Sequence, residues 1–198
     1  MNFKLLQDNL NFLQDLKDLE DLKKKLELYE KFFKSYSKAH NISNFKELER
    51  EIIASLKILD FKDLSFAENA IDLGSGAGFP AVFLAIVLKA NFTLFEPNPK
   101  KASFLSLIKS ELELDNLSII KEKIELHAPK FKARLITSRA LMKIPQLITA
   151  CKGFFDEDSL FVFYKGSSLQ SELVGLKDYK IYEFDKRRYC LILGAKLC

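Results

Sequence analysis

The chain carries one glycine-rich run, Asp72-Leu73-Gly74-Ser75-Gly76-Ala77-Gly78-Phe79-Pro80, between a strand-like segment and a helix-like segment. Three glycines at alternate positions let the backbone turn sharply and approach a ligand closely. Pro80 suits the first position of a helix. A glycine-rich turn in this context holds its ligand over the carboxyl ends of parallel strands. The run therefore predicts a cofactor-binding loop of an α/β fold.

On both sides of this run, short β-like segments alternate with helical ones. We expect strands at residues 70–73, 92–95, 117–120, 134–137, 159–164 and 189–193, and helices at 80–88, 99–114 and between the fourth strand and residue 152. Such alternation is typical of a doubly wound, mostly parallel sheet with helices on both faces. We predict a Rossmann-like α/β domain over residues 67–198.

Residues 1–66 have a different texture and contain no glycine or proline. Apolar residues recur there at steps of three and four, which predicts amphipathic helices. The series is Leu10, Leu13, Leu16, Leu19, Leu22, Leu26, Tyr29, Phe33 and Tyr36. A coiled coil is the alternative, but the repeat drifts and is short. We expect a helical segment that packs on the following domain, with a loop at 40–44 and a further helix at 47–60.

Composition excludes several classes of protein. The chain has 198 residues and a net charge of +4, which allows a polyanionic partner without requiring one. Cys151, Cys190 and Cys198 lack metal-ligand spacing, and His40 and His127 stand alone, so we expect no metal site and no disulfide framework. The N-terminus does not resemble a signal peptide, and the best apolar run is too short to span a bilayer. We expect a cytoplasmic protein that acts away from membranes.

The spacing of the glycine loop narrows the choice of cofactor. Dinucleotide loops read GxGxxG and hold a pyrophosphate, whereas this loop reads GxGxG and follows a carboxylate, Asp72. A carboxylate suits the ammonium end of S-adenosylmethionine better than a pyrophosphate. Glu96 ends the next strand, where its carboxylate can accept hydrogen bonds from both ribose hydroxyls. The alternative is a structural turn beside an ordinary surface glutamate.

Several further motifs occur in order along the chain. The sequence has Phe92-Thr93-Leu94-Phe95-Glu96 and then Lys100-Lys101-Ala102-Ser103-Phe104-Leu105, followed by Ser138-Arg139-Ala140 and Lys165-Gly166. With the glycine loop and Asn41-Ile42-Ser43, this set resembles the glucose-inhibited division protein B family of small-subunit ribosomal RNA guanine-N7 methyltransferases. The resemblance runs from about Lys38 to the C-terminus. It implies a class I methyltransferase fold and S-adenosylmethionine as cofactor. It also implies methyl transfer to a guanine of 16S ribosomal RNA, guanine 527 in the family.

The sequence departs from the family pattern in two places. The family usually has an Arg-His pair followed by two apolar residues and Asp-Ser, where this chain has Arg50-Glu51-Ile52-Ile53-Ala54-Ser55. A second Arg-His pair near the C-terminus is Arg188-Tyr189 here. These changes affect the RNA-facing part of the protein more than the cofactor loop.

Matched by position, the resemblance implies cofactor contacts at Gly74, Phe79, Glu96, Ile124, Glu125 and Arg139. Judged by the charged residues just before it, Lys121, Glu122 and Lys123, Glu125 is predicted instead to be a solvated residue. Arg139 ends the fourth strand and can grip a phosphate or a cofactor carboxylate, or form a structural ion pair. We predict an RNA-binding rim composed of Arg50, Lys100, Lys101, Arg139, Lys165, Arg187 and Arg188.

Guanine N7 carries no proton at neutral pH, so its methylation needs alignment rather than a general base. We therefore expect no catalytic residue other than a positioning role for Arg139. The expected partner is 16S ribosomal RNA or the small-subunit particle, and we expect a monomer. Two alternatives remain, because fold alone does not fix function. One is a methyltransferase of the same fold that acts on a small molecule or protein, and the other is a non-catalytic RNA-binding assembly factor.

Overall fold

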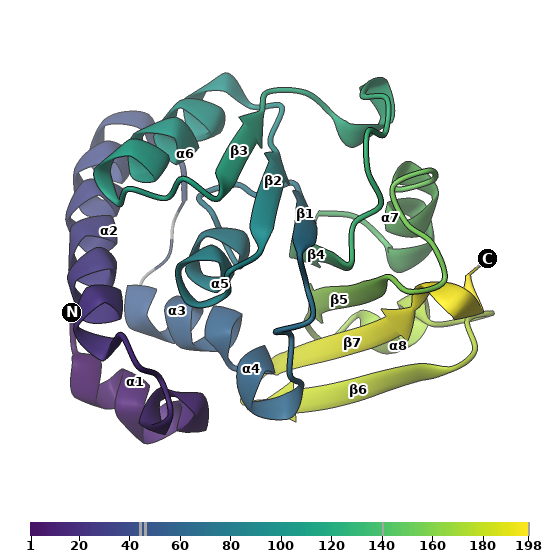
Figure 1. Ribbon diagram of the computed structural model, residues 1–198, viewed down its shortest axis with the longest axis horizontal. Helices are drawn as coiled ribbons and strands as arrows, with labels where there is room; N and C mark the ends of the chain where they lie inside the picture. Colours follow the sequence, from purple (N-terminus) through teal and green to yellow (C-terminus); the bar gives the residue numbers. More distant parts are fainter. Residues whose placement is uncertain (44, 46, 140, 198) are drawn as a thin grey trace.

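The computed structural model describes residues 1–43, 45, 47–139 and 141–197. A seven-stranded sheet lies at its centre, with the strand order β3-β2-β1-β4-β5-β7-β6 (Figure 1). The strands are β1 (Asn69–Leu73), β2 (Asn91–Phe95), β3 (Leu117–Ile120), β4 (Leu135–Arg139), β5 (Leu160–Lys165), β6 (Tyr179–Phe184) and β7 (Arg187–Leu193). Neighbours from β3 to β5 pair in parallel, and β7 runs antiparallel to β5 and β6. The predicted α/β fold with a mostly parallel sheet is confirmed.

Helices cover both faces of the sheet, and each face has its own apolar core. The helices are α1 (Phe3–Asn9), η1 (Asn11–Gln14), α2 (Leu19–His40), α3 (Leu48–Leu56), α4 (Ile58–Phe61), α5 (Ala81–Val87), α6 (Pro99–Glu111), η2 (Ile124–Leu126), α7 (Ile144–Ala150), α8 (Leu169–Glu172) and η3 (Gly194–Lys196). One core joins the helices from α1 to α6 to the face of the sheet bearing Phe92 and Val162. The second joins α7 and α8 to the face bearing Ile71 and Phe161. Burial on both faces explains why the central strands are mostly apolar.

The N-terminal helices pack against the sheet domain through one aromatic side chain in particular. Tyr29 of α2 is buried, and its ring meets Phe83 of α5 edge to face with 4.7 Å between ring centroids. Its hydroxyl donates a hydrogen bond to the carbonyl oxygen of Ala77 in the glycine loop. Through this hydrogen bond, the N-terminal segment contacts the backbone of the glycine loop. The predicted division between residues 66 and 67 stays a prediction.

The N-terminal helical stretch is interrupted before α2, although the helical spacing of apolar residues continues across the interruption. Instead of continuous helix from Leu10, the chain forms η1 and then begins α2 at Leu19. The Asp60 carboxylate accepts hydrogen bonds from the backbone N–H groups of Asn11 and Phe12, which stabilises the break from a distant part of the chain. At the other end, α2 stops at His40 because Asn41 takes the left-handed conformation, with φ of 49°. Asn44, in the predicted loop, lies outside the described residues.

The carboxyl ends of the parallel strands lie together along one edge of the sheet. Strands β1, β2, β4 and β5 all end at this edge, and β7 begins there because it runs antiparallel to β5. The chain crosses from one side of the sheet to the other between β1 and β4, which is the position where open α/β sheets bind ligands. This edge is called the carboxyl edge below.

Candidate active site at the carboxyl edge

The glycine loop leaves β1 in a backbone conformation that few other residues adopt. Gly74, Gly76 and Gly78 have φ values of 66°, 59° and 95°, which lie in the left-handed region that favours glycine. The backbone N–H of Gly74 donates to the carbonyl oxygen of Phe95 at 2.9 Å, tying the loop to the end of β2. A side chain on Gly76 would meet no atom closer than 3.8 Å. This loop therefore leaves room for a ligand directly above Gly76.

Glu96 braces the same loop. Its Oε2 accepts from the backbone N–H of Gly76 at 2.7 Å, and its Oε1 accepts from the backbone N–H of Asn98 at 2.8 Å. The side chain is buried at the carboxyl edge. Because each carboxylate oxygen has a second lone pair, both oxygens can still accept a bond from a ligand hydroxyl. Glu96 thus couples the loop to the predicted ribose position.

A first cavity, of about 110 Å³, opens beside the loop and is called the loop cavity below. Gly74, Ile124 and Glu125, three of the predicted cofactor contacts, line it together. The other lining residues are Leu73, Phe95, Pro97, Glu122, Lys123, Leu141 and Met142. Phe79 and Glu96, two other predicted cofactor contacts, are not among the residues that line this cavity.

Asp72 lies under the loop at the end of β1 and is fully buried. Its Oδ1 accepts a hydrogen bond from the Thr137 hydroxyl at 2.5 Å, whereas its Oδ2 has no hydrogen-bond partner among the described residues. Burial raises the pKa of Asp72 to about 7, although the Ser75 and Thr137 hydroxyls act to lower it. The site therefore holds an unsatisfied acidic group that a cationic ligand would complete.

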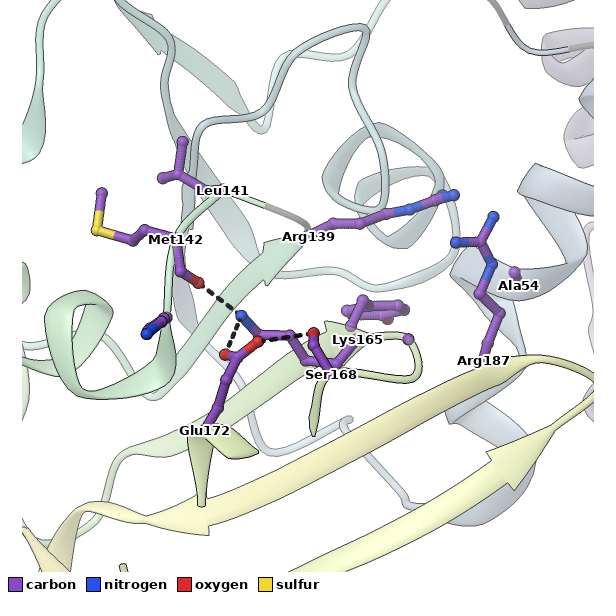
Figure 2. Close-up of a pocket in the computed structure, with 11 residues that line it drawn as sticks. Ala54, Arg139, Leu141, Met142, Lys165, Ser168, Glu172 and Arg187 are labelled. Carbon is purple, nitrogen blue, oxygen red and sulfur yellow. Dashed lines mark hydrogen bonds and ion pairs between the residues drawn. The ribbon is translucent and has the colours of Figure 1, made fainter. Parts of the chain in front are cut away.

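A second cavity, of about 380 Å³, adjoins the first and is called the acceptor cavity below (Figure 2). It lies between the ends of β4 and β5 and the start of β7. Its lining residues are Ala54, Arg139, Leu141, Met142, Lys143, Tyr164, Lys165, Gly166, Ser168, Glu172 and Arg187. Leu141 and Met142 line both cavities and form a common wall between them.

Lys165 lies in the wall of the acceptor cavity as part of a buried ion pair. Its Nζ is 2.7 Å from Glu172 Oε2 and 2.6 Å from the carbonyl oxygen of Met142 (Figure 2). Glu172 also accepts bonds from the Ser168 hydroxyl and the backbone N–H of Ile144. Burial acts to raise the pKa of Glu172, but the bond and charge of Lys165 lower it below its usual value. The pair is therefore ionised and joins β5, α7 and α8.

Arg139 is the cation at the carboxyl edge that packs beside two aromatic rings. Its guanidinium carbon lies 5.4 Å from the ring centroid of Phe45 and 5.5 Å from that of Phe79. It forms an ion pair with Glu51 of α3, and Arg187 also pairs with Glu51, at 2.8 Å. Burial lowers the pKa of Arg139 to about 10, with the Arg187 charge acting in the same direction. The Arg139 guanidinium thus stays positively charged at neutral pH. Of the predicted cofactor contacts, Phe79 packs against this guanidinium.

The remaining predicted RNA-binding residues lie around this edge at the surface. Lys100 and Lys101 begin α6 directly after β2, and Arg50 is exposed on α3 and paired with Glu47. Arg188 pairs with Glu183 of the neighbouring strand. Lys165 and Arg139 are thus largely buried, whereas these four side chains reach solvent. Their contacts with RNA stay predictions.

Sequence reasoning missed four contributors to the site, namely Phe45, Glu51, Met142 and Glu172. Glu51 appeared only as a departure from the family pattern, and nothing local marks it as a partner for arginines 88 and 136 residues away. Leu141 and Met142 follow the Ser-Arg-Ala motif, so their place beside it was the one available signal. Ala140 of that motif lies outside the described residues.

Two further properties of the described residues concern metals and membranes. No helix in the described part of the chain is long and apolar enough to cross a bilayer. Within those same residues, no group of three or more His, Cys, Asp or Glu side chains is arranged to hold a metal ion.

Known structures share the fold of this chain. A SAM-dependent methyltransferase from Aquifex aeolicus matches 79% of this chain and 96% of its own, with a TM-score of 0.62 and 15% identity. A ribosomal protein L11 methylase from Lactobacillus delbrueckii subsp. bulgaricus matches 76% of this chain and 81% of its own, with a TM-score of 0.61 and 12% identity. At these identities the likeness establishes the fold alone.

Sequence relatives give a closer match. The ribosomal RNA small subunit methyltransferase G of Campylobacter jejuni strain 81-176 is 48% identical over 92% of this chain and 96% of its own. That of Campylobacter hominis is 45% identical over 92% of this chain and 99% of its own. The family model described as rRNA small subunit methyltransferase G matches residues 22–190, which confirms the resemblance. The chain belongs to the rRNA small subunit methyltransferase G family.

Proposed function

We propose that this protein transfers a methyl group from S-adenosylmethionine to N7 of a guanine in 16S ribosomal RNA. The observation that carries the proposal is the common wall of Leu141 and Met142 between the loop cavity and the acceptor cavity. A cofactor in the first and a base in the second would meet at this wall. Family membership and the names of the relatives identify the acceptor class.

The residues around the loop cavity fit S-adenosylmethionine. Asp72 offers a buried carboxylate oxygen without a hydrogen-bond partner among the described residues, which suits an ammonium group. Glu96 offers two acceptors for ribose hydroxyls, and Ile124 gives an apolar surface for an aromatic base. When bound, this cofactor supplies a methyl group whose bond to sulfur breaks as its bond to guanine N7 forms.

The chain's own contribution is to hold and align the acceptor. The N7 lone pair attacks without losing a proton, so no general base is required. Lys165 uses two of its three N–H groups on Met142 and Glu172, leaving one for an acceptor such as the guanine O6 oxygen. Leu141 and Met142 exclude water from the junction. Alignment of this kind can lower a barrier by ~7–11 kcal/mol.

The test is to map N7-methylguanine in 16S ribosomal RNA from a strain lacking the gene. We expect one methylated guanine to be lost and then restored by the parent gene but not by the Glu96→Ala variant. Guanine 527 is the position that the family resemblance implies. An unchanged methylation map would contradict the proposal. It would favour a small-molecule or protein substrate if the purified protein binds S-adenosylhomocysteine, and a non-catalytic RNA-binding role if it does not.

A further inference from the structure

We propose that Glu51 is a positioning residue, which fixes the Arg139 guanidinium beside the acceptor cavity. The inference rests on the proposed function. One Glu51 carboxylate holds two arginines, since it pairs with Arg139 Nη2 through Oε2 and accepts from Arg187 Nη2 at 2.8 and 2.9 Å. The Glu51 side chain is only 16% exposed. A single acidic group thus organises two cations in the cavity wall.

The surroundings make this carboxylate necessary for the placement of Arg139. The Arg139 side chain is 9% exposed and packs beside the rings of Phe45 and Phe79, which also contact each other. A buried guanidinium without a counter-ion is strongly disfavoured, and the neighbouring Arg187 would repel it. Without Glu51, we expect Arg139 to turn toward water and leave its position beside the two rings.

Helix α3 holds Glu51 in place before any ligand binds. The Tyr189 hydroxyl donates to the carbonyl oxygen of Ala54 at 2.8 Å, and the Tyr164 hydroxyl donates to that of Ser55 at 2.9 Å. The Ser55 hydroxyl donates in turn to the carbonyl oxygen of Glu51. These bonds anchor the last turn of α3 to β5 and β7, so the carboxylate one turn earlier stays over the carboxyl edge.

The position given to Arg139 leaves one donor free for a substrate. Its Nη1 is buried and has no hydrogen-bond partner among the described residues. Arg139 also lines the acceptor cavity, whereas Glu51 lines a neighbouring groove that shares Ala54 and Arg187 with that cavity. The carboxylate therefore orients the guanidinium from behind without occupying the cavity. An N–H group held in this way can meet an oxygen of the base or of an adjoining phosphate.

A positioning role predicts opposite effects on binding and on turnover. In Glu51→Ala, the methylation rate at saturating RNA and cofactor should fall at least tenfold. RNA affinity should be equal or higher, because Arg187 loses its counter-ion and becomes available to phosphate. The salt dependence of RNA binding should steepen by about one unit for that additional contact. Damage to the fold alone would instead weaken both binding and turnover.

Matched variants separate charge from placement. Glu49→Ala removes the same charge from the same helix, but Glu49 contacts the backbone N–H of Asn2 and no arginine, so its rate should equal the parent's. Glu51→Gln keeps one acceptor without the charge and should fall between the parent and Glu51→Ala in rate. Glu51→Asp keeps the charge and should retain the parent's salt dependence. A cooperative thermal transition checks that each variant is folded.

A double-variant comparison tests whether Glu51 acts through Arg139. If it does, the variant carrying both Arg139→Ala and Glu51→Ala should be no slower than Arg139→Ala alone. Multiplying losses, or a parental rate in Glu51→Ala, would overturn the inference while leaving the proposed function intact. If the parent itself forms no N7-methylguanine, the proposed function fails. The salt slopes need no turnover, and they still decide whether Glu51 restrains the arginines.

Discussion

Three carboxylates at the carboxyl edge differ because each has different neighbours. Glu96 accepts two backbone N–H bonds, which braces the glycine loop. Asp72 is buried with one oxygen unsatisfied among the described residues. Glu51 pairs with two arginines beside the acceptor cavity. Three carboxylates of one site therefore have different partners: backbone N–H groups for Glu96, one hydroxyl for Asp72, and two guanidinium groups for Glu51.

We expect Glu96→Ala to weaken binding of S-adenosylhomocysteine at least tenfold, which corresponds to ~1.4 kcal/mol. The change removes both the ribose acceptors and the bond that holds the Gly76 backbone. Titration calorimetry measures the affinity, and Glu113→Ala, which removes an exposed glutamate at the end of α6, serves as the control. Parental affinity in Glu96→Ala would show that the ribose assignment is wrong.

The raised pKa of Asp72 has a defined effect on stability. Burial raises it from 3.8 to about 7, so between these values the folded protein holds a proton that the unfolded chain releases. The stabilising contribution of this group is therefore complete below pH 3.8 and is lost as the pH rises through 7. A cation bound beside Asp72 would reverse this preference by favouring the ionised form.

Binding of S-adenosylhomocysteine should consequently strengthen by roughly tenfold between pH 6 and pH 8, because Asp72 must release its proton to meet the ammonium group. Calorimetry in buffers of different ionisation enthalpy should detect this proton release. In Asp72→Asn the affinity should be lower and nearly independent of pH over the same range. A parent affinity that stays constant from pH 6 to 8 would rule out Asp72 as the ammonium partner.

The sequence indicates which residues come together where their position after a strand fixes their place in the fold, although their cofactor contacts stay predictions. Gly74, Ile124 and Glu125 follow strands that end at one edge, so their convergence on one cavity follows from strand order. Glu51 could not be found in this way, because its partners are brought to it by α3 packing across β5 and β7. Phe79 was expected to contact the cofactor, and its ring packs against Arg139, so the cofactor contact stays a prediction.

At the level of elements, the junction of α3 with the sheet sets the geometry of the site. The last carbonyl groups of a helix have no partner within it. In α3, two of them receive bonds from the hydroxyls of Tyr164 and Tyr189, which are buried on neighbouring strands. Tyr189 stands where the family usually has histidine, and Ala54 presents the carbonyl that Tyr189 reaches. The two departures from the family pattern thus meet in one hydrogen bond.

Tyr189→Phe should lower the free energy of unfolding by ~1–3 kcal/mol, since it leaves a buried carbonyl group unsatisfied. Urea unfolding followed by circular dichroism measures the loss. Tyr36→Phe is a suitable comparison, because its hydroxyl bonds the Lys100 carbonyl oxygen near the surface, where water can replace it. Equal losses in the two variants would mean that the Tyr189 bond does not secure α3.

The sequence predicted the central elements better than those at the periphery. Strands β1, β2, β4 and β5 lie inside the sheet and are rich in apolar residues because both of their faces are covered. Strand β6 was missed, although Tyr179 to Phe184 partly alternates apolar and polar residues and a two-residue turn, Asp185-Lys186, follows it. The break before α2 was also missed, because the Asp60 carboxylate that stabilises it lies 48 and 49 residues away in the chain.

In the whole molecule, the parallel sheet collects groups from distant segments at one edge. Arg139 and Lys165 come from strand ends, Lys100 and Lys101 begin the helix after β2, and Arg187 begins the antiparallel strand β7. The N-terminal segment supplies Glu51 from α3, and Phe45 from the stretch between α2 and α3, to the same region. The molecule thus combines a cofactor loop, an acceptor cavity and a mainly basic border, as a methyltransferase acting on RNA requires.

The proposed reaction requires this edge of the sheet to align S-adenosylmethionine with guanine N7. Its most direct test is transfer of labelled methyl from S-adenosylmethionine to 16S ribosomal RNA by the purified protein, followed by identification of the methylated nucleoside. We predict 7-methylguanosine at one position, with naked RNA and small-subunit particles compared as substrates. At saturating cofactor, the single-turnover rate should show no ionisation of a catalytic base between pH 6 and 8.5. Label in any other nucleoside, or in none, would contradict the account.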